Sequence, residues 1–259
     1  MREKTVTISG LRTRYLETET VRKAPLVLLH GWGSSITSWR RVAEVLESAN
    51  VKVFIPDLPG FGDTPQPPRP WHLNDYIVFV HEFVKTLGIK TFCLAGHSFG
   101  GQISIGYATQ YPKKIRKLIL IAAARIVRRR KLKVAIFGFF SKLGNLAFSM
   151  PFLSFLRPVF QKTWYKLSGE QDYYRASNVM RETMKLILDR EMRDELIKIR
   201  VPTLIIWGEK DLVTPLADAK ILHGEIQGSR LHVFPQQNHD LNKKVPEKLA
   251  AEISNWVTR

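Results

Sequence analysis

The chain has 259 residues with a formal net charge of +17, and 44% of its residues are hydrophobic. This length and ordinary apolar content predict one large globular domain with an insertion, or two small domains, and exclude a disordered or fibrous chain. The single cysteine, Cys93, excludes an intrachain disulfide.

Short apolar runs bounded by turn residues predict strands along most of the chain. They are Thr5–Ser9, Leu11–Leu16, Leu26–Leu29, Val51–Ile55, Thr91–Ala95, Leu118–Ile121, Pro202–Trp207 and Leu231–Phe234. Helical spacing of apolar residues predicts helices over the segment containing Trp39 and Leu46, and over Leu73–Leu87, Gln102–Tyr111, Leu216–Leu222 and Val245–Trp256. This alternation predicts an α/β fold with a mostly parallel, doubly wound sheet and helices on both faces.

The alternation stops after Ala124, and the segment from Arg125 to Lys198 contains no clear strand. We therefore predict three parts: residues 1–124 as the first part of the core, 125–198 as a helical cap inserted after the sixth strand, and 199–259 as the last part of the core. Within the cap, Tyr173–Ile199 predicts one amphipathic helix. Such sheets place their sites at the carboxyl ends of the strands, so the cap is expected to lie above the site.

The stretch Gly-His-Ser-Phe-Gly around Ser98 follows a predicted strand directly and precedes a helical pattern. A strand, then Gly-x-Ser-x-Gly, then a helix is the context of a nucleophile elbow. A serine on so sharp a turn has a strained backbone, so Gly96 and Gly100, two residues before and after it, must be small. The turn places Ser98 at a helix N-terminus, where backbone N–H groups receive developing negative charge.

A serine hydroxyl needs a base within hydrogen-bond reach, and the base needs an orienting acid. Asp211 follows the predicted strand Pro202–Trp207, and His239 follows the strand Leu231–Phe234. Both therefore lie on the same rim of the sheet as Ser98, in the chain order Ser, Asp, His that this type of sheet uses. Glu209 remains the alternative acid.

Two other histidines lie near the predicted site. His97 precedes Ser98 on the strained turn and is expected to be packed away from it. His30 is expected to brace the turn that follows the strand Leu26–Leu29. Asp240 adjoins His239 and is poorly placed to bond its Nδ1.

Five segments carry recognisable motifs. They are His30-Gly31-Trp32-Gly33, Asp57-Leu58-Pro59-Gly60-Phe61-Gly62, Gly96-His97-Ser98-Phe99-Gly100-Gly101, Pro202 to Asp211, and Asn238-His239. With them the chain resembles the α/β-hydrolase superfamily over nearly its whole length. The resemblance implies Ser98 as nucleophile, His239 as base, Asp211 as orienting acid, and an oxyanion hole from the backbone N–H groups of Trp32 and Phe99. It implies no metal and no organic cofactor.

Asn238 departs from the family pattern, in which glycine often precedes the catalytic histidine. Asparagine adopts positive φ more readily than most residues. We therefore expect Asn238 to take that conformation as a tolerated turn residue.

The residue at the elbow also limits the reaction. Epoxide hydrolases and haloalkane dehalogenases of this fold form an alkyl-enzyme ester on an aspartate, which Ser98 excludes. A serine hydrolase that cleaves a carboxylic ester, thioester or lactone through an acyl-enzyme is the predicted function. The alternatives are C–C bond hydrolase, proline-type aminopeptidase and acyltransferase or perhydrolase activity on the same triad, and a non-catalytic binding module.

The segment Arg125–Arg200 holds 17 Lys and Arg residues and 7 Asp and Glu residues. It combines a basic run, Arg128–Lys133, with an aromatic stretch, Val134–Leu156. We expect the substrate pocket to be lined by Trp32, Phe137, Phe140, Phe148 and Phe152. The expected partner is an apolar small-molecule acyl substrate.

The basic cap also suggests weak contact with an anionic membrane surface. No nucleic-acid module is recognisable, and the sequence predicts no oligomeric state. The N-terminal residues show no signal peptide, which with the single cysteine predicts a cytoplasmic location.

Overall fold

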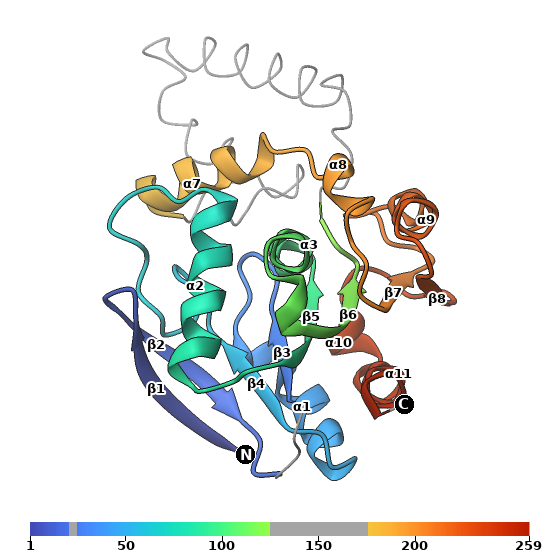
Figure 1. The fold of residues 1–259 in the computed structure, drawn as a ribbon, viewed down its shortest axis with the longest axis horizontal. Coiled ribbons are helices and arrows are strands. Elements are labelled where there is room, and N and C mark those ends of the chain that lie inside the picture. The colour runs from blue at the N-terminus through green and yellow to red at the C-terminus, as the bar shows by residue number, and fades with distance from the viewer. Residues whose placement is uncertain (21–24, 125–175, 259) are drawn as a thin grey trace, which may run out of the picture.

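The computed structural model describes residues 1–20, 25–124 and 176–258 (Figure 1). Within these ranges eight strands form one sheet in the order β1-β2-β4-β3-β5-β6-β7-β8. The strands are β1 (Arg2–Ile8), β2 (Leu11–Glu17), β3 (Leu26–Leu29), β4 (Val53–Pro56), β5 (Phe92–His97), β6 (Ile115–Ile121), β7 (Thr203–Gly208) and β8 (Arg230–Phe234). β2 runs antiparallel to β1 and to β4, and the other neighbours are parallel. The predicted mostly parallel sheet is confirmed.

Helices cover both faces of this sheet. The described helices are α1 (Arg40–Ser48), α2 (Leu73–Thr86), α3 (Phe99–Gln110), α7 (Asn178–Leu188), α8 (Arg193–Leu196), α9 (Leu216–Glu225), α10 (Leu241–Lys244) and α11 (Pro246–Thr258), with 3-10 turns at Ile36–Trp39 and Pro112–Lys114. α1 and α11 pack on one face, and α2, α3 and α9 pack on the other, whereas α7 lies beyond the end of α2 (Figure 1). The sheet is therefore doubly wound, as predicted.

The central strands alternate their side chains between two separate cores. In β6, Leu118 and Leu120 pack into the core under α2 and α3, whereas Ile119 and Ile121 pack into the core under α1 and α11. All four side chains are fully buried. Alternate residues of a strand point to opposite faces, so a strand covered on both sides is a continuous apolar run. Each such side chain contributes about 1.5–3 kcal/mol by leaving water.

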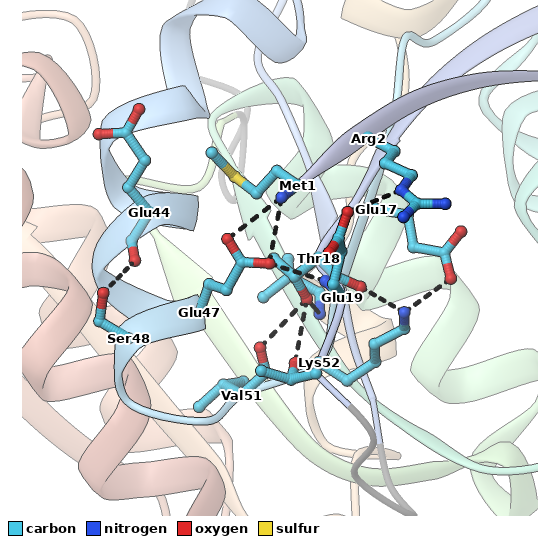
Figure 2. Close-up of polar contacts among 12 residues, drawn as sticks. Met1, Arg2, Glu17, Thr18, Glu19, Glu44, Glu47, Ser48, Val51 and Lys52 are labelled. Carbon is cyan, nitrogen blue, oxygen red and sulfur yellow. Dashed lines mark hydrogen bonds and ion pairs between the residues drawn. The ribbon is translucent and has the colours of Figure 1, made fainter.

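Polar contacts join the end of β2 to the start of β4 and to α1 (Figure 2). Lys52 Nζ bonds Glu17 Oε1 at 2.6 Å and also contacts the carbonyl oxygen of Thr18. Thr18 Oγ1 accepts a hydrogen bond from the Val53 N–H at 2.7 Å. The Glu47 carboxylate of α1 accepts the N–H of the residue after Thr18 at 2.7 Å. These bonds pair the end of β2 with the start of β4, where the antiparallel part of the sheet joins the parallel part.

The predicted helix Tyr173–Ile199 is wrong in one respect. In the described part of that segment the chain forms two helices, α7 and α8, with a break at residues 189–192. Asp189 caps α7, and the side chain of Met192 is fully buried in the break. An ion pair between Arg190 and Glu195 spans the break. Burial of Met192 against the core therefore overrides the continuous helical pattern.

β6 is the sixth strand, and the predicted cap follows it. Residues 125–175 lie outside the described ranges, so the cap boundaries stay a prediction. In the portions of the chain that the structure describes, no helix combines the length and the apolar character needed to cross a bilayer.

Candidate active site

Ser98 lies at the sharp turn between β5 and α3. Its backbone has φ 52° and ψ −114°, which a residue with a Cβ rarely adopts. Such a conformation costs on the order of 1–3 kcal/mol and persists only where the surroundings hold it. Here the Ser98 N–H donates to the Ile121 carbonyl at 3.0 Å, and the Ser98 carbonyl accepts from the N–H groups of Gln102 at 3.2 Å and Ala124 at 3.0 Å. These bonds hold Ser98 half-buried at the carboxyl ends of β5 and β6.

The two glycines of the elbow have no room for a side chain. A Cβ on Gly96 would lie 2.2 Å from the Gly100 carbonyl oxygen, and a Cβ on Gly100 would lie 2.4 Å from the Leu29 carbonyl oxygen. Both distances are far below van der Waals contact. The predicted need for small residues on either side of Ser98 is confirmed by this packing.

Asp211 lies in the turn after β7, and its carboxylate is fully buried. It accepts four hydrogen bonds: from the N–H groups of Val213 at 2.9 Å and Thr214 at 2.8 Å, from the Thr214 hydroxyl at 2.8 Å, and from His239 Nδ1 at 2.8 Å. Burial alone would raise the pKa of Asp211. The hydrogen bonds and charge of His239, with the bonds from Thr214, instead hold this pKa below its ordinary value of 3.8. Asp211 is therefore ionised at neutral pH.

His239 lies in the loop after β8, and its ring is oriented by Asp211. The Nδ1–H donates to the carboxylate, which leaves Nε2 on the opposite side of the ring as a proton acceptor. Among the described residues, no hydrogen bond joins His239 to Ser98 Oγ. Hydrogen bonds of this kind are often long in unliganded enzymes and shorten when substrate binds.

His97 joins the elbow to the loop of His239. Its Nε2 lies 3.0 Å from the His239 carbonyl oxygen, and the two imidazole rings pack with centroids 4.8 Å apart. The ring of Trp39 packs edge-on against His97 from the other side. Burial, and after it the neighbouring charge of His239, lower the pKa of His97 to about 3. His97 is therefore neutral and donates Nε2–H to the His239 carbonyl. As expected, it is packed, and its contact with the histidine loop was not predicted from the sequence.

The backbone N–H groups of Trp32 and Phe99 belong to segments next to Ser98. Phe99 follows Ser98 and is the first residue of α3, and a Cβ on Gly31, which precedes Trp32, would lie only 3.2 Å from Ser98 Cβ. The oxyanion hole assigned to these two groups stays a prediction.

His30 and Asp57 hold the turn that carries Trp32. His30 Nδ1 donates to the carbonyl of the next residue at 2.8 Å, and its Nε2 accepts the Leu58 N–H at 2.9 Å. The buried Asp57 carboxylate accepts the Ile36 N–H at 2.8 Å. His30 thus braces the turn, as expected.

Of the predicted pocket residues, Trp32 alone lies within the described ranges. The Trp32 ring is half-buried and packs edge-on against Phe61, with centroids 4.9 Å apart, and against Phe99 at 5.4 Å. The other predicted pocket residues lie outside the described ranges: Phe137, Phe140, Phe148 and Phe152. Trp32 is thus the half-exposed member of an aromatic cluster whose other two rings, Phe61 and Phe99, are buried in the core.

Two expectations about the flanking loops are resolved. The positive φ expected at Asn238 is wrong, because Gln236 takes it instead, with φ 60°. Asn238 uses its side-chain oxygen to accept the Asp240 N–H at 3.1 Å, which stabilises the turn without positive φ. The alternative acid Glu209 accepts the Gln236 N–H at 2.8 Å, and the carboxylate that contacts His239 is that of Asp211.

Replacing His97 with glutamine is expected to make the free energy of unfolding fall less steeply as the pH is lowered. Folded His97 has a pKa of about 3 and an unfolded histidine one near 6.5, so between these values the unfolded chain binds more protons. The stability that His97 contributes is complete above about pH 6.5 and is lost as the pH falls toward 3. Each pH unit in this window removes up to about 1.4 kcal/mol of unfolding free energy.

Urea unfolding of both proteins from about pH 7 down to about pH 4.5 measures the difference. Glutamine can still donate an amide N–H to the His239 carbonyl, so the variant is expected to fold. Equal pH slopes for the two proteins would contradict a neutral buried His97.

Comparisons with known proteins agree with the fold. A profile of the alpha/beta hydrolase fold matches residues 24–244. A 2-hydroxy-6-oxo-2,4-heptadienoate hydrolase of Pseudomonas putida is 29% identical over 88% of this chain and 90% of its own length. Monoacylglycerol lipase abhd6-A of Xenopus laevis is 26% identical over 91% of this chain and 76% of its own length. The structure of an esterase from Exiguobacterium antarcticum superposes with a TM-score of 0.78 and 24% identity over the whole of both chains.

Proposed function

Because the chain belongs to the alpha/beta hydrolase fold family, we propose that it is a serine hydrolase that cleaves carboxylic esters through an acyl-enzyme. The observation that carries the proposal is the hydrogen-bonded pair of buried Asp211 and His239, 2.8 Å apart, beside a serine held at φ 52°. In this proposal Ser98 is the nucleophile, His239 the general base and then acid, and Asp211 the orienting acid.

The proposed reaction follows from the positions of these groups. Ser98 Oγ attacks the ester carbonyl carbon while His239 Nε2 takes its proton. The carbonyl oxygen becomes an oxyanion that accepts hydrogen bonds from the N–H groups of Trp32 and Phe99. His239 then returns the proton to the leaving alcohol, and the acyl group stays on Ser98. Water attacks the acyl-enzyme by the same steps, with His239 again taking and returning the proton.

Several features support an apolar acyl substrate. Trp32, a predicted pocket residue, is half-buried and packs against Phe61 and Phe99, and one relative is named a monoacylglycerol lipase. Thioesters and lactones react by the same steps. The predicted contact of the basic cap with an anionic membrane, and a cytoplasmic location, belong to this proposal as well.

A second candidate is hydrolysis of a C–C bond in a dienoate. The relative from Pseudomonas putida is named for that kind of substrate and matches at 29% identity. Its support is the relative alone, because the serine, histidine and aspartate are common to both reactions. The ester and dienoate substrates therefore have to be compared directly.

The test is a panel of p-nitrophenyl esters from acetate to palmitate, assayed beside a 2-hydroxy-6-oxo-dienoate whose loss is followed by absorbance. We expect turnover of the esters with an optimum at medium chain length, because the predicted aromatic pocket residues would bury apolar acyl carbons. Turnover of the dienoate with no ester hydrolysis would contradict the esterase proposal and support the C–C hydrolase reaction instead. A chain that turns over neither and is not labelled by a fluorophosphonate is not a serine hydrolase.

A further inference from the structure

The hydroxyl of Thr214 contacts both members of the Asp211–His239 pair. Thr214 Oγ1 lies 2.8 Å from Asp211 Oδ2 and 3.2 Å from His239 Nδ1. We propose that Thr214 is a positioning residue of this pair, which keeps the Asp211 carboxylate in place and holds the proton of His239 on Nδ1. The inference rests on the proposed function, and nothing in the sequence analysis singled out Thr214.

The position of Thr214 is set by the sheet. Its N–H donates to Asp211 Oδ1 at 2.8 Å, and its carbonyl accepts the Trp207 indole N–H at 2.6 Å. Trp207 belongs to β7 and is fully buried, and Thr214 is only 5% exposed. The hydroxyl therefore cannot turn to water without breaking contacts with the end of β7.

The proton count assigns a direction to each bond. His239 Nδ1 carries a proton, so the Thr214 oxygen accepts it as a second, longer partner beside Asp211. The single hydroxyl proton of Thr214 then goes to Asp211 Oδ2 at 2.8 Å or to the Ala122 carbonyl at 3.2 Å. The shorter distance and the charge of the carboxylate favour Asp211.

The Thr214 hydroxyl also lies close to the segment that follows β6, 3.2 Å from the Ala122 carbonyl oxygen. Ala122 follows the last residue of β6 and has φ 45°, and two residues later the Ala124 N–H donates to the Ser98 carbonyl. On the other side of the site, His97 bonds the His239 carbonyl. Thr214 thus lies where the acid, the base and the segment that supports Ser98 meet.

Thr214→Val removes the hydroxyl and keeps the shape of the side chain. Asp211 then accepts three hydrogen bonds instead of four, and its negative charge beside His239 is less well compensated. We expect kcat to fall on the order of 10- to 30-fold, as for loss of a hydrogen bond to a charged group, with little change in KM.

Thr214→Ser keeps the hydroxyl and is expected to restore kcat. A merely structural role would change stability, measured by urea unfolding, without shifting the proton resonance of His239 Nδ1. The downfield proton NMR resonance of the Nδ1 proton is a readout that needs no substrate, and we expect it to shift in Thr214→Val and to return in Thr214→Ser. If Thr214→Val does not fold, Thr214→Ala supplies the variant without a hydroxyl.

The outcomes separate this inference from the proposed function. If the wild type hydrolyses esters and is labelled by fluorophosphonate, and Thr214→Val matches it in kcat and resonance, the role of Thr214 is overturned and the serine hydrolase stands. If the wild type shows neither turnover nor labelling, the proposed function fails, and the role of Thr214 fails with it.

Discussion

Replacing Ser98 with alanine is expected to abolish ester hydrolysis, with a loss in kcat of about 10⁵-fold or more. The alcohol oxygen is the atom that bonds to the substrate, and no described side chain at the elbow can replace it. Alanine has the same Cβ as serine and meets the same strain at φ 52°, so the fold is expected to survive. Turnover of p-nitrophenyl esters and fluorophosphonate labelling measure the effect.

Ser34→Ala is a matched control for this experiment. Ser34 lies in the neighbouring turn after Gly33, and its hydroxyl bonds Ser38 Oγ at 2.5 Å. The control is expected to keep nearly full activity and labelling. Activity in Ser98→Ala close to that of the wild type would rule out Ser98 as the nucleophile and move the search to another group at the carboxyl ends of the strands.

Replacing Asp211 with asparagine is expected to lower kcat by about 10⁴-fold. The amide oxygen can still accept the N–H groups of Val213 and Thr214 at the place of Oδ1. The amide nitrogen then faces His239 Nδ1 and donates to it, which holds the imidazole proton on Nε2. In that tautomer His239 cannot accept the proton of Ser98. Steady-state kinetics on the best ester of the panel measure the loss.

Glu209→Gln is the matched control, because it makes the same chemical change two residues earlier. The exposed Glu209 carboxylate contacts the Gln236 N–H, and an amide oxygen can accept that bond equally well. We expect activity within about twofold of the wild type, in line with the small effect of surface substitutions. A large loss in Glu209→Gln with a small one in Asp211→Asn would reverse the assignment of the acid.

The sequence by itself determined the strands of the sheet and the rim of the sheet on which the candidate site residues lie. Strands covered on both faces are short apolar runs, and the elbow needs glycine at two positions, so both are visible in local patterns. The run from Leu118 to Ile121 is such a strand, and Gly96 and Gly100 are the two small residues. Because parallel strands end on one rim, the positions of Asp211 and His239 after their strands were enough to place them on the rim of Ser98.

Only the tertiary structure decided which groups touch. The sequence left Glu209 open as the acid, placed positive φ at Asn238 rather than Gln236, and continued one helix through the break before α8. It also contained no signal for Thr214, whose hydroxyl lies between Asp211 and His239. The acid, the break before α8 and the place of Thr214 depend on the meeting of segments that lie far apart in the chain. A periodic pattern reports which face a residue occupies but not which side chain lies opposite to it.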